Sequence, residues 1–596
     1  MSEATSRPAP WRRARLVFAV IIPFVVFLLP ESPADGSAGL SGAGPITLLP
    51  PLFAISLAFA TARTVLPLFG GVWMGATMLA LREGHGVSSV FQGVKDTLVK
   101  YVFHTSVYAP ASGEATDGSF QTFNLAVIGF VFVLVGMVSI TIRAGGMAGI
   151  AERFVVLARS ARATRLSAFG LGMVVFFDDY ANTLIVGGAM RPLADRMRIA
   201  REKLAWIVDS TAAPVAGLSI LSTWIAFEIS QFAPHLGHPA LGLSESAGYA
   251  IFIQSIPYRF YCILTLVFVF WVCLTSRDFG PMLTAEQRSF RTGAVLRPGS
   301  VPMSSHGGVN HSHKEGIPLY AHVALLPIAV TLVAIIGLFL RHGEAGHAQH
   351  LASGLSIEHM REVLAGVSGV ADGADANTRL LFYGSVMGWF TAALLAVGRR
   401  LLSVREVLAA TLSGSRAMSI AVTVLLLAWA MSAVCGDLGT REYMASMAPL
   451  IPPQLLPAGL FFLACAVSFA TGSSWSTMGI LLPIVIGLAA TVGAGSVLGA
   501  QGMVIVTIGA VLDGSIFGDH CSPISDTTIL SSTAVGSDHM DHVKTQVPYA
   551  VTVMLVAFLA GYLPAGTGFP VVFSLAIGAG ALVSIVVLLG RRADHY

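Results

Sequence analysis

The chain has few charged residues for its length. Of its 596 residues, 11% are Asp, Glu, Lys or Arg, whereas 55% are hydrophobic and the mean hydropathy is +0.75. A soluble globular chain carries about 25% charged residues, so the composition excludes an ordinary soluble protein. Apolar runs of about 20 residues, the length of a helix that crosses a bilayer, recur along the chain. The sequence therefore predicts a polytopic α-helical protein embedded in a lipid bilayer.

Signatures of several other functions are missing. The five cysteines form no CxxC pair, so we expect small core residues rather than disulfides or a zinc site. The chain has no GxxxxGK[ST] loop for ATP, no HExxH motif and no Gly-Asp protease motif. Its net charge is only +3, with basic residues in short clusters, so we expect no nucleic-acid partner. We expect neither an enzyme nor a resident cofactor.

Two adjacent acids, Asp178 and Asp179, lie inside an apolar stretch, residues 174–190. An ionised carboxylate at membrane depth costs about 2.5–3.5 kcal/mol on an insertion scale, so it needs a partner or a water-filled cavity. Asn182 and Thr183 follow one helical turn later. Such oxygens suit a hard cation or a proton. The alternatives are a polar clasp between two helices and an intramembrane enzyme that uses the two acids as a catalytic pair.

Basic residues place both flanks of this stretch on one side of the membrane. Five Lys or Arg residues lie in each of the loops 143–165 and 191–203, and the positive-inside rule predicts that both loops are cytoplasmic. Residues 166–190 are therefore predicted to form a re-entrant helical hairpin that opens to the cytoplasm. Non-helical backbone at its tip is allowed where protein or water covers it. The alternative is one ordinary span.

The remainder of the chain is predicted to form two halves with about 12 spans in total, in a bacterial cytoplasmic membrane with both termini inside. The second half contains another predicted hairpin, residues 454–490, which has no basic flank and should open outward. The predicted parts are a cytoplasmic tail (1–15), a first half (16–274), a cytoplasmic linker rich in Gly, Pro and His (275–320) and a second half (321–596).

A helix interrupted at a proline follows each predicted hairpin. The segment 214–223 lines up with 523–532, and Asp209 and Asp519 each precede the proline. Asn182-Thr183 likewise lines up with Ser476-Thr477. Inverted repeats of discontinuous helices that meet at the bilayer midplane are typical of secondary transporters. The predicted fold is therefore an all-α inverted-repeat transporter with two re-entrant hairpins and two interrupted transmembrane helices.

The interrupted helices also indicate an ion site. Each proline lacks a backbone donor and disfavours helix before it, which frees carbonyl groups at membrane depth. Freed carbonyls and side-chain oxygens suit Na+ or Li+, and a carboxylate that holds either the cation or a proton allows exchange. The candidate ion-binding residues are Asp178, Asp179, Asn182, Thr183, Asp209, Ser210, Thr211, Ser474, Ser476, Thr477, Asp513, Asp519, His520, Ser522, Asp526 and Thr527. The candidates for direct Na+ ligands are Asp178, Asn182, Asp209, Thr477 and Asp519.

Two of these assignments have alternatives, and one further acid, Glu228, has two interpretations. Asp209 could instead cap a helix N-terminus. His520 could carry protons near neutral pH or simply hydrogen-bond a freed carbonyl. Glu228, near the predicted external end of its span, could line an exit path or face water.

Four segments resemble hallmark segments of the NhaC-type Na+/H+ antiporter family. They are Phe176-Phe-Asp-Asp-Tyr-Ala-Asn-Thr183, Val208-Asp-Ser-Thr-Ala-Ala-Pro-Val-Ala216, Ala470-Thr-Gly-Ser-Ser-Trp-Ser-Thr477 and Gly518-Asp-His-Cys-Ser-Pro-Ile-Ser-Asp-Thr-Thr528. The resemblance implies the two-hairpin inverted-repeat fold of the wider ion transporter superfamily and an elevator-like carrier, often a homodimer. In sodium-coupled carboxylate carriers of that superfamily, Ser-Asn-Thr motifs at the hairpin tips bind sodium. The corresponding positions here are Ala-Asn-Thr (181–183) and Trp-Ser-Thr (475–477).

The resemblance leaves two functions to compare. Some relatives exchange organic acids or amino acids against sodium and protons, and a carboxylate substrate requires Arg, Lys or helix N-termini in its site. The predicted hairpins and interrupted helices have no Arg or Lys in their cores. We therefore expect exchange of Na+ (or Li+) for H+, with these two ions as the transported species. The alternative is a Na+/H+-coupled carrier of a small organic acid or amino acid.

Overall fold

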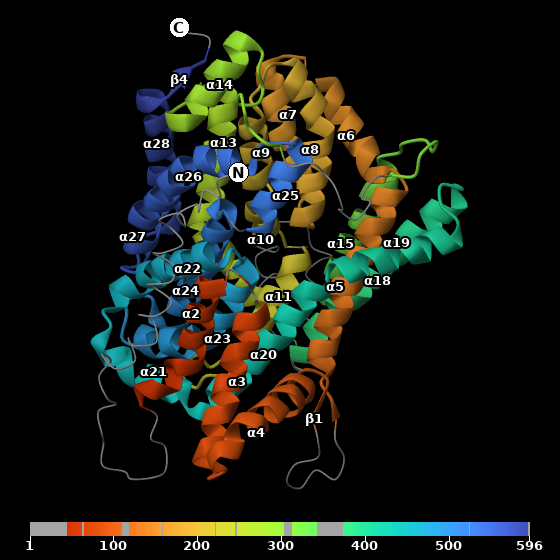
Figure 1. Ribbon diagram of the computed structural model, residues 1–596. Coiled ribbons are helices and arrows are strands. Elements are labelled where there is room, and N and C mark those ends of the chain that lie inside the picture. Colours follow the sequence, from red (N-terminus) through yellow and green to blue (C-terminus); the bar gives the residue numbers. More distant parts are fainter. Residues whose placement is uncertain are drawn as a thin grey trace, which may run out of the picture.

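The structure, a computed structural model, is helical almost throughout (Figure 1). It describes residues 44–593, apart from positions 62, 64, 158, 221 and 524 and the segments 110–118, 245–246, 303–312 and 343–373. The predicted tail, residues 1–15, and the first predicted span lie outside the described residues. Within those residues, nine helices are long and apolar enough to cross a membrane, or up to eleven if each of two bent helix pairs is one span.

The first half begins with helices toward the lower end of the molecule in Figure 1 and then crosses it in α5. Helices α15 and α18 belong to the second half, yet they pack beside α5. The elements are α2 (Leu49–Thr61), α3 (Val65–Arg82), α4 (Ser89–Asp96), a π-helix (Thr97–His104), the paired strands β1 (Tyr108–Ala109) and β2 (Ser119–Phe120), α5 (Thr122–Arg143), α15 (His322–His342) and α18 (Ala374–Gly398).

The first predicted hairpin is present. After α6 (Gly146–Leu157), the chain forms α7 (Ala161–Val174), leaves helical geometry at residues 175–178 and turns back into α8 (Asp179–Arg196). Ser160 sets the start of α7, because its hydroxyl oxygen accepts a hydrogen bond from Ala163 N at 3.2 Å. A single ordinary span through this region is excluded.

The first interrupted helix is also present. It consists of α9 (Arg201–Ser210), α10 (Ala213–Leu218) and α11 (Thr223–Phe232). The bend of 52° lies between the segment Arg201–Leu218 and the segment Thr223–His235. Pro214 lies in the first turn of α10, where its missing N–H removes no helical hydrogen bond. The start of α11 is attached to the hairpin tip, since Thr223 N donates to Phe177 O at 2.9 Å.

A further interruption was not predicted. The expected continuous span 249–274 is instead α12 (Gly248–Ser255) and α13 (Phe260–Thr275), bent by 47°. A single 3-10 turn, Ile256–Tyr258, separates them, and Arg259 follows it. The chain then pairs β3 (Arg277–Asp278) with β4 (Arg591–Arg592) and forms α14 (Gly280–Thr292), so part of the predicted linker is helical.

The second half repeats the arrangement of hairpin and interrupted helix. The expected hairpin 454–490 corresponds to α22 and α23, and the second interruption lies at residues 522–525, between α24 and α25. The elements are α19 (Val404–Ala417), α20 (Ser419–Leu438), α21 (Thr440–Met447), α22 (Leu456–Thr471), α23 (Ser474–Ala494), α24 (Gly499–Cys521), α25 (Asp526–Val535), α26 (His539–Val556), a π-helix (Ala557–Tyr562), α27 (Leu563–Ala565) and α28 (Val571–Leu589).

The two repeats are interlocked. The second arm of the first hairpin, α8, packs against α25 of the second repeat, and the second arm of the other hairpin, α23, packs against α11 of the first. The α7–α8 hairpin lies in the upper part of the molecule and the α22–α23 hairpin in the lower part (Figure 1). The tips therefore approach the middle from opposite ends, as an inverted repeat requires.

Close packing of the second hairpin depends on two glycines one turn apart, Gly514 and Gly518 on α24. A Cβ atom at Gly518 would overlap the backbone of Ser468 and Phe469 on α22, and one at Gly514 would lie 2.5 Å from Phe461 O. Small residues at this spacing let two membrane helices approach until their backbones touch.

We predict that Gly518→Ala lowers stability by about 1–3 kcal/mol, because the added methyl group meets backbone that cannot move aside. Gly188→Ala on α8 is the matched control, since nothing lies within 4 Å of a Cβ atom there. Thermal unfolding in detergent, followed by loss of monodisperse protein on size-exclusion chromatography, measures both variants. Equal midpoints for the two would contradict the packing argument.

Candidate functional site

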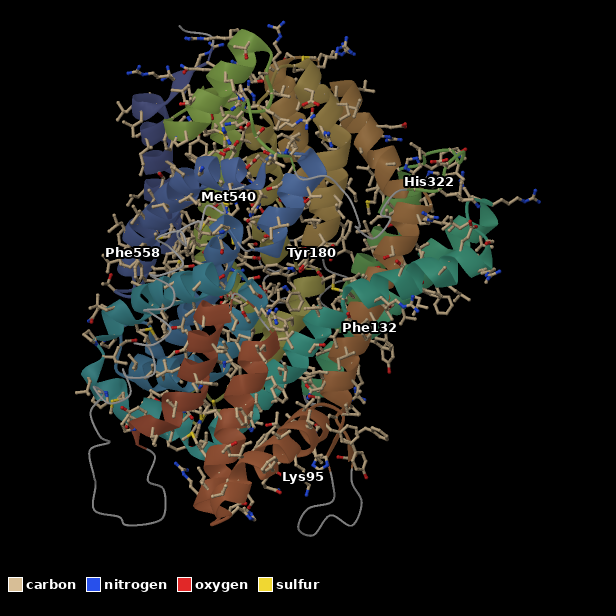
Figure 2. All side chains as sticks on the ribbon, in the orientation of Figure 1. Lys95, Phe132, Tyr180, His322, Met540 and Phe558 are labelled. Carbon is tan, nitrogen blue, oxygen red and sulfur yellow. The ribbon has the colours of Figure 1, made fainter. Side chains whose placement is uncertain are left out.

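The tip of the first hairpin is held by Asp178. Its Oδ1 accepts a hydrogen bond from Ala181 N at 2.7 Å, which makes it the N-cap of α8, and its Oδ2 accepts one from Thr223 Oγ1 at 3.2 Å. The carboxylate is buried in the middle of the molecule. Figure 2 labels Tyr180, two residues further on, near mid-height, whereas Lys95 lies at one end. Asp178 thus joins the hairpin tip to the break before α11.

Asp179 connects the two hairpin tips. Its Oδ1 accepts a hydrogen bond from Trp224 Nε1 at 3.2 Å. The Trp224 ring meets the Trp475 ring edge to face at 6.0 Å, and Trp475 belongs to the first turn of α23. Phe227 packs against Trp475 at 4.2 Å between ring centroids. Trp224 therefore contributes a hydrogen bond at the site as well as packing.

Asn182 has an unusual set of partners. Its Nδ2 lies within hydrogen-bond distance of three carbonyl oxygens, those of Gly172 at 2.7 Å and of Val175 and Thr211 at 2.9 Å. This surplus of acceptors determines the orientation of the amide, with nitrogen toward the carbonyls. Its Oδ1 is buried and has no hydrogen-bond partner. A buried acceptor without a donor requires an explanation, and a bound cation or water supplies one.

The second hairpin carries a corresponding acid. Asp519 Oδ2 accepts a hydrogen bond from Ser474 Oγ at 3.0 Å, and its Oδ1 accepts one from Ser525 Oγ at 2.7 Å. Ser525 also lies 2.9 Å from Thr527 Oγ1. Ser474 comes from the hairpin tip and Ser525 from the break between α24 and α25. Asp519 therefore joins tip to break in the second repeat, as Asp178 does in the first.

The end of α9 connects the two repeats. Ser210 Oγ lies 2.8 Å from His520 Nε2, and Tyr261 OH lies 2.7 Å from His520 Nδ1, so His520 bonds two hydroxyls and no freed carbonyl. Asp209 Oδ2 accepts a hydrogen bond from Gln546 Nε2 at 2.7 Å. Asp209 lies in the last turn of α9, so it does not cap a helix N-terminus.

A buried arginine lies against two acids. Arg259, at the break between α12 and α13, places its Nε 3.1 Å from Asp513 Oδ1 on α24 and its Nη2 3.6 Å from Glu228 Oε1 on α11. All three side chains are fully buried. The statement about the hairpins and interrupted helices did not cover this residue, because Arg259 belongs to the expected span 249–274. The bend at residue 259 places its guanidinium against α11 and α24. Glu228 does not face water.

Several other candidates donate hydrogen bonds to backbone carbonyl groups. The hydroxyls of Thr183, Thr211, Ser476 and Thr477 donate to carbonyls within one turn of their own helices, and Ser522 donates to Phe469 O across the hairpin. These bonds stabilise the helix ends without assembling a ligand set. The side chain of Asp526 lies outside the described part of the structure.

Sequence reasoning missed Arg259, Gln546 and His542. A signal for the last two was present, since His542 and Gln546 lie four residues apart in α26 and so share one face of it. For Arg259 the only signal was the neighbouring Pro257.

Two hairpins of opposite direction, each tied by an acid to an interrupted helix, define a multi-pass membrane protein of the secondary transporter class. The comparison with protein families agrees. The model of the Na+/H+ antiporter family matches residues 215–566, more than half of the chain, and the chain belongs to that family. The match begins in α10 and extends to the C-terminal side of α27, so the first hairpin precedes it.

Individual relatives are similar over very different lengths. An uncharacterized protein of Haemophilus influenzae is 30% identical over 92% of this chain and 95% of its own length. The Na+/H+ antiporter NhaC of Alkalihalophilus pseudofirmus is 37% identical over 18% of this chain and 22% of its own. The malate-2H+/Na+-lactate antiporter of Bacillus subtilis is 30% identical over 19% of this chain and 24% of its own.

We predict that Asn182→Ala destabilises the first hairpin by about 1–3 kcal/mol, because three buried carbonyls lose their shared donor. Thr183→Val is the control, since the hydroxyl of Thr183 bonds only Asp179 O on the same helix at 2.9 Å. Hydrogen exchange of residues 172–183, measured by mass spectrometry, shows whether the backbone of the hairpin tip becomes less protected in Asn182→Ala. Unchanged protection in Asn182→Ala would rule out the bridging role.

Proposed function

We propose that this transporter exchanges Na+ (or Li+) for H+ across a bacterial cytoplasmic membrane by alternating access. One observation carries the proposal, namely the buried Oδ1 of Asn182, which has no hydrogen-bond partner at the tip of the first hairpin. A carbonyl-type oxygen held away from donors is a ligand for a dehydrated monovalent cation.

The neighbourhood of that oxygen supports a cation rather than an anion. Asp178 lies four residues before Asn182, so the two residues occupy the same face at the start of α8 and the acid supplies negative charge. The donors at this tip already have acceptors. The amide nitrogen of Asn182 faces three carbonyls, and Trp224 Nε1 faces Asp179. An anionic substrate would find no free donor among these groups.

The second repeat supplies the acid needed for alternating access. The oxygens of Asp519 accept hydroxyl donors from Ser474, at the tip of the second hairpin, and from Ser525, in the second break. Serine hydroxyls can rotate to accept as well as donate, so they need not occupy the oxygens of Asp519 when a cation binds. The carboxylate of Asp519 therefore suits a cation that passes between the hairpin tips. We assign Asp178, Asn182 and Asp519 to the cation. We assign Asp209 to the proton pathway rather than to the cation.

An organic acid or amino acid as the transported solute is the alternative. Arg259 is the feature that such a solute would need, but the two acids Asp513 and Glu228 already lie against its guanidinium. An anionic solute would therefore have to compete with two carboxyl groups for this guanidinium.

The same proposal places the face with α14 and the C-terminus in the cytoplasm and includes a homodimer, as the resemblance implies.

The test uses proteoliposomes with an acid interior and a fluorescent reporter of the pH gradient. Na+, Li+ and K+ are added in turn, followed by malate, lactate and amino acids. We expect Na+ or Li+ alone to collapse the gradient, because the cation enters as the proton leaves. Collapse only after an organic solute is supplied would replace the proposal with its alternative.

We predict that Asp178→Asn and Asp519→Asn each lower the rate of Na+-driven dequenching at least about 10-fold, which corresponds to about 1.4 kcal/mol. Asn is as good an N-cap as Asp, so the first variant removes charge while retaining the start of α8. Asp437→Asn is the control, because Asp437 forms a half-exposed ion pair with Lys100 at 2.8 Å, away from both tips. Wild-type rates in both test variants would overturn the assignment.

A further inference from the structure

A continuous chain of buried polar side chains leads away from Asp209 to the edge of the molecule. Gln546 Nε2 donates to Asp209 Oδ2, and Gln546 Oε1 lies 2.6 Å from His542 Nε2. His542 Nδ1 lies 2.9 Å from Ser532 Oγ, which lies 3.1 Å from His539 Nδ1. Neither the ion site proposed above nor the family resemblance uses Gln546, Ser532 or the two histidines.

The partners determine where most of the protons lie. Gln546 Nε2 faces two acceptors, Asp209 Oδ2 and His520 O, so its amide oxygen must face His542. An amide oxygen only accepts, and His542 Nε2 must therefore carry a proton. By the same reasoning His539 Nε2, which lies 2.8 Å from Pro523 O, also carries one. In their neutral forms both histidines thus turn an unprotonated Nδ1 toward Ser532.

Ser532 cannot satisfy all of its neighbours. Its single hydroxyl proton is within reach of three acceptors, Thr528 O at 2.9 Å and the Nδ1 atoms of His542 and His539. With both histidines neutral, this one proton can serve at most one of the two Nδ1 atoms, so the other Nδ1 has no donor. A proton added to that second Nδ1 removes the deficit, because the nitrogen then donates to Ser532 Oγ. The arrangement is built to hold one additional proton.

We propose that His542 holds the proton that this transporter exchanges, with Asp209 as its counter-ion and with Ser532 and His539 as its route to one face of the molecule. This inference rests on the Na+/H+ exchange proposed above and names the group that carries the proton. His542 Nε2 lies 4.0 Å from Asp209 Oδ2, so a protonated His542 forms a buried ion pair with an acid of the other repeat.

The transfer conserves protons at each step. His539, which is partly exposed next to the surface residue Met540 (Figure 2), takes up a proton at Nδ1. It passes that proton to Ser532 Oγ as Ser532 passes its hydroxyl proton to His542 Nδ1. His539 becomes neutral, Ser532 is unchanged and His542 becomes an imidazolium. The reverse sequence returns the proton to the face that carries Arg297 and Asp538.

Other charged groups near α26 are engaged elsewhere. Among the described residues of the helices packed against it, α9 turns Asp209 toward His542, α24 contributes His520 and α25 contributes hydroxyls. The other acid of this part of α24, Asp519, accepts from Ser474 and Ser525. The remaining groups have partners elsewhere or are exposed: Tyr261 on α13, bonded to His520; Arg201 on α9, paired with Asp195; Lys203 on α9, paired with Asp278; Glu286 on α14, paired with Arg165; Arg288 on α14, paired with Glu202; Arg291, exposed on α14; Tyr549 on α26, bonded to Asp278; Asp541 on α26, paired with Arg297; Lys544, exposed on α26; and Tyr562, bonded to Asp513. Asp209 is therefore the acid that compensates a charge on His542.

Three consecutive residues couple this proton to the cation. Thr211 O accepts from Asn182 at the cation site, Ser210 bonds His520, and Asp209 accepts from Gln546 next to His542. A cation at Asn182 therefore acts on the same helix end that holds the counter-ion of His542. The added positive charge disfavours the imidazolium, so cation binding expels the proton.

The test measures protons released per Na+ bound to the purified full-length protein. Calorimetric titration with NaCl near pH 6, in buffers of different ionisation enthalpy, gives that number, with choline chloride as the blank. If the free protein holds His542 as an imidazolium against Asp209, 4.0 Å away, wild type should release about one proton when Na+ binds. We predict that His542→Gln still binds Na+ but releases less than about a fifth as many protons, because glutamine cannot take up a proton at this pH.

Two variants complete the design. His85→Gln changes an exposed histidine paired with Glu83 and should release as many protons as wild type. Asp209→Asn removes the counter-ion and should bind Na+ with little proton release. This variant replaces His542→Gln in the test if His542→Gln does not fold. Loss of Na+ binding in Asp209→Asn would show that Asp209 is a cation ligand and would overturn the inference.

The outcomes separate this inference from the proposed function. Wild-type proton release in His542→Gln overturns the role of His542 while Na+/H+ exchange stands. Failure of wild-type protein to bind Na+ or to collapse the pH gradient with it overturns both. A pH profile of transport that flattens in His542→Gln but not in His85→Gln supports the inference.

Discussion

The C-terminal end of α9 is the constraint on which the rest of the core depends. A helix that stops inside a membrane protein leaves carbonyl groups that need partners, because no bulk water is present to supply them. The carbonyl of Thr211 accepts a hydrogen bond from Asn182 of the first hairpin. The side chains of Ser210 and Asp209 bond His520 on α24 and Gln546 on α26. One helix end thereby joins both repeats.

Burial of charge gives the core a second constraint. Arg259 lies between Asp513 and Glu228, and Lys203 lies against Asp278 and over the ring of Trp206 at 4.5 Å. A buried ion pair contributes little net stability compared with apolar packing, but removal of one partner is costly. These pairs therefore determine how the interrupted helices dock more than how stable the protein is.

Much of the architecture could be predicted before the structure was known. The Arg clusters on both flanks of residues 166–190 required a hairpin, and Pro214 and Pro523 marked the helix breaks. The bend at Arg259 was not predicted, because Pro257 was the only sign of it in an apolar run of ordinary length. Asp178, Asn182 and Asp519 were correctly placed at tips and breaks, but the partners of Asp209 were not foreseen, since Gln546 lies more than 300 residues away.

The amino-acid sequence by itself determined the hydrophobic spans, the hairpins, the proline breaks and the buried acids, because local hydropathy, charge and backbone chemistry act over a few residues. Only the tertiary structure decided what each acid contacts. It made Asp178 a helix cap, left Asn182 Oδ1 without a donor and placed His542 4.0 Å from Asp209. The physical reason is that hydrogen bonds and ion pairs act over a few ångströms between segments far apart in the chain, and the packing of two inverted repeats sets those distances.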